Sequence, residues 1–271
     1  AIYGLKQTGL AWEKALRKTI TDGNWKSNNY DECLYYRCTD DGKIAALTTN
    51  VDDISFIRND EKEVNRMVTY LLGKYEGRDL GTADKLIGTN LIVTEDRVVL
   101  NHARFVEGVV VEGMGSTDVR EVHTPLDPGV DLTARQEDEE EIEEECFPYA
   151  RIVGKLMFLA DMTWPDISSS VREFSRRISP PHMRQWRGLQ HLLLYLTGTI
   201  DVTIRYNKSD AADESKMPTG YSDSDWEDEV ESRRIVMGYI TKLNGSPVVW
   251  KSKLKNLVTL STLEAEWTSM A

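Results

Sequence analysis

The sequence has 271 residues, of which 40% are hydrophobic and 29% charged, and its net charge is −12. A chain of this length forms about two globular domains, and since no apolar run approaches the ~20 residues of a transmembrane helix, a membrane protein is excluded. Cys33, Cys38 and Cys146 lack CxxC spacing, which disfavours a zinc site or a disulfide framework and predicts a reducing intracellular compartment.

The first residues, AIYGLKQTGL, contain no initiator methionine and no signal peptide, which predicts a chain that starts inside a longer protein and is not secreted.

Charge is unevenly distributed along this chain. Residues 137–145 (EDEEEIEEE) hold eight acids, so the remainder carries a net charge of only −4. Such a run is typical of a solvated, flexible linker that stays outside any core. Residues 150–208 contain nine Lys or Arg against four acids. This balance fits an ordinary helical surface or a face that follows nucleic-acid phosphates.

Residues 42–59 (GKIAALTTNVDDISFIRN) predict a β-hairpin, because apolar clusters rich in β-branched residues flank the acidic segment NVDD. An amphipathic helix is predicted next, with Asp60 and Glu63 as its capping box. Its apolar residues follow helical spacing, and the pattern places the helix on the hairpin: Val64, Met67, Val68, Leu71, Leu72 and Tyr75.

Residues 120–148 combine prolines with the acidic run, which predicts a long connection and a domain boundary. Between 149 and 196 the apolar spacing is helical, and Pro165 and the pair Pro180-Pro181 divide the stretch into separate helices.

Residues 219–254 alternate strand patterns with turns. Asn244-Gly245 is the strongest of the hairpin signals in this stretch. A helix is predicted to begin at Ser261.

The first candidate site is the pair Asp52-Asp53. Adjacent acids are usually turn residues, and Asp40-Asp41 followed by Gly42 is an example in this chain. A hairpin tip held by apolar strands, however, fixes carboxylates well enough to bind Mg²⁺. Two such metal ions could support nucleotidyl transfer, so both interpretations stay open on the pattern alone.

The second candidate site combines Asp223 and Asp225 on a predicted strand with Glu266 on the helix that Ser261 opens, where Glu264 is the capping partner. A strand acid and a helix acid can build a two-metal nuclease site. The alternatives are a DxD metal motif of a glycosyltransferase and solvated acids on an edge strand.

Several segments carry a resemblance to a known family. AIYGLKQTGLAW resembles the YGLKQ-x-x-x-AW segment of copia-type LTR retrotransposon Pol polyproteins, and residues 50–53 fall where that family has its YVDD box. Further segments resemble the family in the same order: Asp79-Leu80-Gly81, Leu86-Ile87-Gly88, Thr163 to Ile167, Tyr195 to Thr199, Gly220 to Trp226, Arg233-Arg234 and Leu260 to Trp267.

The resemblance implies that Asp52 and Asp53 are the metal-binding pair of a reverse transcriptase palm, and that Asp223 and Glu266 are the first two RNase H carboxylates. The cofactor would be Mg²⁺ or Mn²⁺. The implied partners are an RNA template, a DNA primer, dNTP, an RNA–DNA hybrid and the remainder of the Pol polyprotein. A membrane is not among the implied partners. The segment beside the template and the incoming nucleotide would be Tyr3, Gly4, Leu5, Lys6 and Gln7.

The sequence also departs from the family pattern. The third palm carboxylate is expected upstream of residue 1, and the later RNase H ligands are expected beyond Ala271. Asn50 replaces an aromatic residue beside the acid pair, and Trp164 replaces an arginine. The expected consequence is an incomplete site in each domain.

The resemblance predicts an α+β chain: a partial reverse transcriptase palm at 1–125, thumb or connection helices at 126–217 with the acidic linker 137–145, and a truncated RNase H-like domain at 218–271. That last domain would contain the N-terminal β-hairpins and first helix of the fold. The implied activity is RNA-directed DNA polymerase with RNase H, in a cytoplasmic virus-like particle or the nucleus. The alternative is a catalytically dead or co-opted nucleic-acid-binding remnant.

Overall fold

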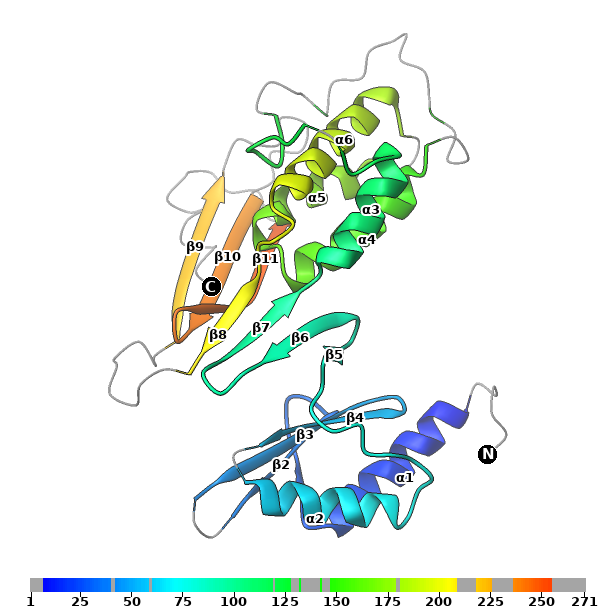
Figure 1. Ribbon diagram of the computed structural model, residues 1–271, viewed down its shortest axis with the longest axis vertical. Helices are drawn as coiled ribbons and strands as arrows, with labels where there is room; N and C mark the ends of the chain where they lie inside the picture. Colours follow the sequence, from blue (N-terminus) through cyan, green and yellow to red (C-terminus); the bar gives the residue numbers. More distant parts are fainter. Residues whose placement is uncertain are drawn as a thin grey trace. The chain divides into compact units, whose positions relative to one another are not determined.

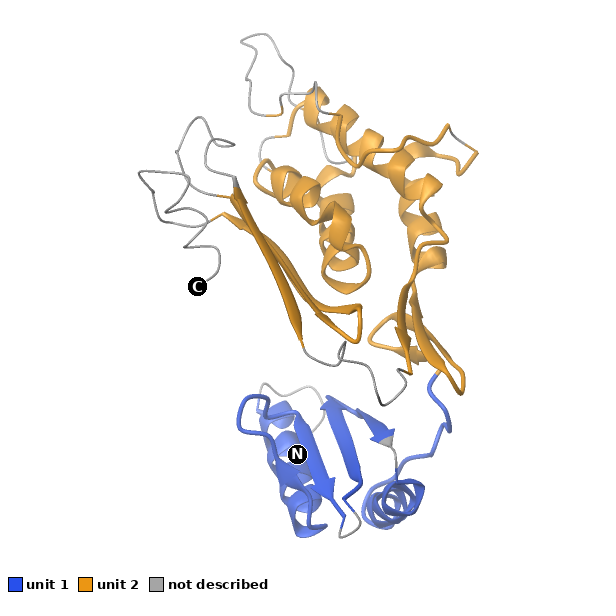
Figure 2. Ribbon diagram, turned by 90° about the vertical axis from the view of Figure 1, so that its left-hand side faces the viewer, with its two compact units in different colours: residues 1–83 blue, residues 84–271 orange. Residues whose placement is uncertain are grey.

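The computed structural model describes residues 7–39, 42–58, 60–118, 120–127, 132, 142, 147–178, 181–208, 218–225 and 236–254. These residues form helices and antiparallel sheets, which confirms a mixed α and β chain. The backbone divides into two compact units, residues 1–83 and 84–271 (Figure 2).

The first unit is one antiparallel sheet covered on one face by two helices (Figure 1). The strands lie side by side in chain order. Ala45 and Leu47 are two residues apart along one strand, so both side chains face the helices. The elements are α1 (Thr8–Asp22), β1 (Lys26–Ser27), β2 (Leu34–Cys38), β3 (Ile44–Asn50), β4 (Asp53–Arg58) and α2 (Glu61–Leu72).

Helix α2 confirms the predicted amphipathic helix, with two corrections. The Asp60 side chain accepts hydrogen bonds from the backbone N–H groups of Lys62 and Glu63, as an N-cap does. The Glu63 carboxylate, however, binds Trp25, Arg37 and Arg66 inside the unit instead of completing the capping box. The helix also ends at Leu72, before Tyr75, although the Tyr75 ring still packs against the core.

The second unit combines two antiparallel sheets with a group of helices. One sheet has the order β5-β6-β7-β8, so the chain leaves it after β7, forms the helices and returns with β8. The other has the order β11-β10-β9. The elements are β5 (Lys85–Leu86), β6 (Thr89–Val93), β7 (Arg97–Asn101), α3 (Ala103–Met114), α4 (Tyr149–Met162), the 3-10 helix η1 (Pro165–Ile167), α5 (Ser168–Ser175), α6 (Met183–Gly198), β8 (Ile204–Asn207), β9 (Thr219–Asp225), β10 (Val236–Leu243) and β11 (Ser246–Leu254).

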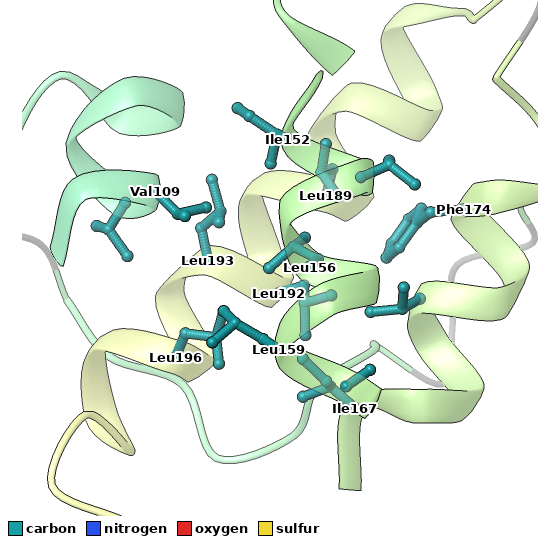
Figure 3. Close-up of a cluster of buried hydrophobic side chains, with 14 of the residues drawn as sticks. Val109, Ile152, Leu156, Leu159, Ile167, Phe174, Leu189, Leu192, Leu193 and Leu196 are labelled. Atoms are coloured by element: carbon teal, nitrogen blue, oxygen red, sulfur yellow. The ribbon is translucent and has the colours of Figure 1, made fainter. Parts of the chain in front are cut away.

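The helices share one apolar core, which draws on residues far apart in the sequence (Figure 3). Gly113 of α3 packs so closely against this core that an added Cβ would be only 2.3 Å from Leu193 Cδ1. Pro165 starts η1 and separates α4 from α5, as predicted. The labelled core residues are Val109, Ile152, Leu156, Leu159, Ile167, Phe174, Leu189, Leu192, Leu193 and Leu196.

Hydrogen bonds join the β9–β11 sheet to the rest of its unit. The indole N–H of Trp250 donates to the carbonyl of Ala160 over 2.6 Å, which links β11 to α4. Tyr206 donates its hydroxyl to the carbonyl of Pro247 over 2.8 Å. The predicted turn Asn244-Gly245 joins β10 to β11, with φ of 52° and 76° at its two residues.

The acidic run was expected outside any core. One of its residues corrects this expectation, because Ile142 packs against the helical core and donates its backbone N–H to the carbonyl of Pro181 over 2.9 Å. The rest of residues 137–145 and the helix predicted from Ser261 lie outside the described residues. Within the described ranges, no helix has the length and apolar character needed to cross a membrane.

Candidate active site

The hairpin of β3 and β4 ends in a two-residue turn that carries the first acid pair. Asn50 pairs with Asp53 across the hairpin, so Val51 and Asp52 form the turn itself. Both aspartates are exposed. The predicted position of the pair at an exposed hairpin tip, with α2 packed on the hairpin, is therefore confirmed.

The turn has an unusual backbone. Val51 has a φ of 54°, in the left-handed region, where a β-branched residue is an outlier. Hairpin turns place Gly, Asn or Asp at such positions, as the Asn244-Gly245 turn of this chain does. A residue held in this region costs on the order of 1–3 kcal/mol and persists only where its surroundings hold it.

Helix α1 contacts the turn. The indole N–H of Trp12 donates a hydrogen bond of 2.8 Å to the carbonyl oxygen of Val51. The same ring meets Tyr75 edge to face, with 5.0 Å between ring centroids. The Tyr75 hydroxyl lies 2.7 Å from the Thr19 hydroxyl on the same helix. Helix α1 thus contacts both the acid-bearing turn and the segment that follows α2.

The acid pair fits part of a metal site. Exposed carboxylate oxygens are the hard ligands that Mg²⁺ and Mn²⁺ favour. Within the described part of the chain, no three His, Cys, Asp or Glu side chains gather closely enough to hold a metal ion. Asp52 and Asp53 could therefore contribute two ligands, and substrate phosphates or another segment would supply the rest.

The second candidate site is described only in part. Asp223 lies on β9, paired with Gly238 of β10, and is exposed. Its side chain accepts a hydrogen bond of 3.0 Å from the backbone N–H of Ser224. Asp225 ends β9. Glu264 and Glu266 lie outside the described residues.

The predicted template segment is also mostly outside the described residues. Tyr3, Gly4, Leu5 and Lys6 are not described, whereas Gln7 is exposed and stands at the N-cap of α1.

The basic stretch 150–208 carries ion pairs with nearby acids. Glu112 on α3 binds Arg151 and Lys155 of α4. Glu173 similarly binds three arginines around α5: Arg172, Arg176 and Arg177. These pairs favour the ordinary helical surface over a face that follows phosphates, because a paired cation has part of its charge already compensated.

The sequence alone does not reveal the contacts that Trp12 and Tyr75 make. Trp12 lies in the AW part of the family-like segment, but a motif does not reveal a hydrogen bond to a turn 39 residues away. Tyr75 continued the helical spacing and was therefore assigned to the apolar face of a helix.

The comparisons with known proteins bear on the whole chain. Residues 1–128 match the family model described as reverse transcriptase (RNA-dependent DNA polymerase). Over 98% of its length the chain is 27% identical to the retrovirus-related Pol polyprotein from transposon TNT 1-94 of Nicotiana tabacum. The chain belongs to the copia-type retrotransposon Pol family. The expectation drawn from the motifs is confirmed, and the glycosyltransferase alternative is not supported.

The relatives differ in how much of their own length this Pol fragment covers. It spans 20% of the tobacco polyprotein. It is 28% identical to a transposon Ty5-1 protein of Saccharomyces cerevisiae, over 98% of the fragment and 84% of that protein. It is also 38% identical to secreted RxLR effector protein 161 of Plasmopara viticola, over 46% of the fragment and 84% of that protein. No solved structure matches the chain.

Proposed function

We propose that this chain contributes Asp52 and Asp53 as metal ligands to RNA-directed DNA synthesis within a Pol polyprotein. The observation that carries the proposal is the position of both carboxylates at an exposed hairpin tip, in a segment that matches the reverse transcriptase family. The partners are an RNA template, a DNA primer and dNTP, in a cytoplasmic virus-like particle or the nucleus.

The chemistry follows from the ligands available. Bound Mg²⁺ or Mn²⁺ would polarise the attacking and leaving oxygens of phosphoryl transfer. The role of this chain is to hold two adjacent aspartates at the tip of a hairpin whose strands are paired up to Asn50 and Asp53. Asn50 beside the pair offers the primer end a polar side chain where the family has an aromatic ring.

We further propose the domain division by family correspondence, with the palm at 1–125, the thumb or connection at 126–217 and the RNase H-like part at 218–271. The RNase H assignment is supported by an antiparallel sheet that carries Asp223 on β9, with Glu266 as its predicted partner. An RNA–DNA hybrid is the proposed substrate of that part.

Metal binding at the tip provides the first test. The 271-residue chain is labelled with ¹⁵N and titrated with Mn²⁺, whose unpaired electrons broaden nearby amide signals. We expect broadening of the signals of residues 50–54, and we expect D52N/D53N to abolish it. D40N/D41N is the matched control, because it removes an adjacent acid pair of the same charge and should leave the broadening unchanged. Equal loss in both variants would show nonspecific attraction and would reject the site.

A second candidate function is a non-catalytic or co-opted role in binding nucleic acid. One observation favours it: a protein named as a secreted effector is 38% identical to part of this chain. A chain with this role would bind an RNA–DNA hybrid, with affinity that falls as salt rises, and D52N/D53N would leave that affinity unchanged. Loss of hybrid binding in D52N/D53N only when Mn²⁺ is present would favour the polymerase site instead.

A further inference from the structure

We propose that Trp12 is the positioning residue of the Asp52-Asp53 tip. Its indole N–H holds the carbonyl of Val51 and thereby keeps the turn in the left-handed conformation that presents both carboxylates. The effect on the backbone stands by itself, whereas its consequence for metal binding rests on the proposed function.

The turn needs a contact from outside the hairpin to stay in its strained conformation. Val51 is 72% exposed, so packing of its side chain does little to compensate for the left-handed backbone. A strained backbone at a functional position persists only when other contacts fix it. The hydrogen bond from Trp12 reaches the carbonyl group of the strained residue itself.

The indole N–H donor is itself fixed in place. Trp12 lies within α1, and its ring is held edge to face by Tyr75. Tyr75 is held in turn by its hydroxyl, which lies 2.7 Å from the Thr19 hydroxyl and donates to the carbonyl of Ala15 over 3.3 Å. The position of the indole N–H is therefore determined by the same core that supports the strands.

A purely structural role for Trp12 makes a different prediction. If the ring only packs against Tyr75, then phenylalanine at position 12 keeps that contact and the tip is unaffected. If the N–H positions the tip, Trp12→Phe releases Val51 while the ring contact is retained. The two roles are therefore separated by one substitution.

The experiment uses the full chain and measures two quantities. The first is the Mn²⁺ midpoint, which is the Mn²⁺ concentration at which broadening of the tip amide signals is half complete. The second is the set of ¹³C chemical shifts of Val51. We expect Trp12→Phe to move the Val51 shifts away from left-handed values even without metal and to weaken the Mn²⁺ midpoint by about fivefold, the factor typical of one hydrogen bond. Adding Val51→Gly should restore the midpoint, because glycine adopts positive φ without strain. Trp25→Phe is the matched control, since it removes another indole hydrogen bond of the same unit and should leave both readouts unchanged.

Unchanged Val51 shifts and an unchanged midpoint in Trp12→Phe would overturn the inference. So would a loss of binding that Val51→Gly does not restore, because that result indicates general damage to the unit. If wild-type chain shows no Mn²⁺ effect that depends on Asp52 and Asp53, the proposed metal site fails. The metal-free Val51 shifts then still decide whether Trp12 holds the turn.

Discussion

Trp25 donates its indole N–H to the carboxylate of Glu63 over 3.0 Å, inside the core of the first unit. Glu63 is only 8% exposed, and Arg37 and Arg66 bind the same carboxylate. Burial by itself would raise the pKa of Glu63, but the hydrogen bond and charge of Arg66, followed by the charge of Arg37 and the Trp25 hydrogen bond, bring the pKa below its ordinary value.

Glu63→Gln should therefore destabilise the first unit by about 1–3 kcal/mol, because the charge-assisted hydrogen bonds are lost. Since the folded pKa lies below the unfolded one, the contribution of Glu63 is present at neutral pH and is lost as the pH falls through the folded pKa. Urea unfolding at pH 7 tests the change. The exposed residue Glu76 provides the control, and a Glu76→Gln loss as large as that of Glu63→Gln would contradict the prediction.

Replacement of either of two glycines of α3 by alanine should change the stability of the second unit, in opposite directions at the two positions. Gly113→Ala forces Leu193 and Ile152 to move and should cost about 1–3 kcal/mol. Gly108→Ala meets no atom within 4 Å and should stabilise the helix by about 0.5–1 kcal/mol. Thermal unfolding of the two variants measures both signs. A gain from Gly113→Ala would show that α3 does not pack closely on α6.

His102 should make the second unit less stable in mild acid. The residue is 1% exposed, and its ring contacts Phe105 and Phe158 and shares a hydrogen bond of 2.8 Å with the Thr163 hydroxyl. Burial lowers the pKa of His102, because the charged ring would lose its hydration.

The unfolded chain then takes up the His102 proton at a higher pH than the folded chain does. Stability should be full above the unfolded pKa of about 6.5 and should fall as the pH drops below it. NMR titration of the imidazole gives the folded pKa directly, and urea unfolding from pH 8 to 5 gives the slope. An unchanged slope in His102→Gln would assign the pH dependence to other groups.

The chain by itself should show neither polymerase nor RNase H turnover. The described residues bring two acids together at the hairpin tip and no third metal-binding side chain beside them. A two-metal reaction needs both ions fixed at once, and two carboxylates supply only part of the oxygen ligands that two Mg²⁺ ions need. Primer extension on an RNA template, and cleavage of an RNA–DNA hybrid with Mg²⁺ or Mn²⁺, test the two activities. Hybrid cleavage that Asp223→Asn abolishes would refute inactivity and would identify the RNase H site.

The sequence by itself determined the local elements and the family. Apolar spacing located α2, and the polar segment between two β-branched clusters located the β3–β4 hairpin with its acids. Asn244-Gly245 predicted its turn because these residue types favour positive φ. Each of these signals depends on neighbours in the chain, and the family motifs were similarly recognisable from short segments in order.

Only the tertiary structure decided which distant residues meet. Val51 at the tip is the wrong residue type for its backbone, and its carbonyl accepts a hydrogen bond from Trp12, 39 residues earlier. The pairing of β7 with β8 and the packing of Gly113 against Leu193 likewise join segments that no local pattern connects. Propensity acts over a few residues, whereas the cost of strain or burial is balanced by contacts that exist only after the chain has folded.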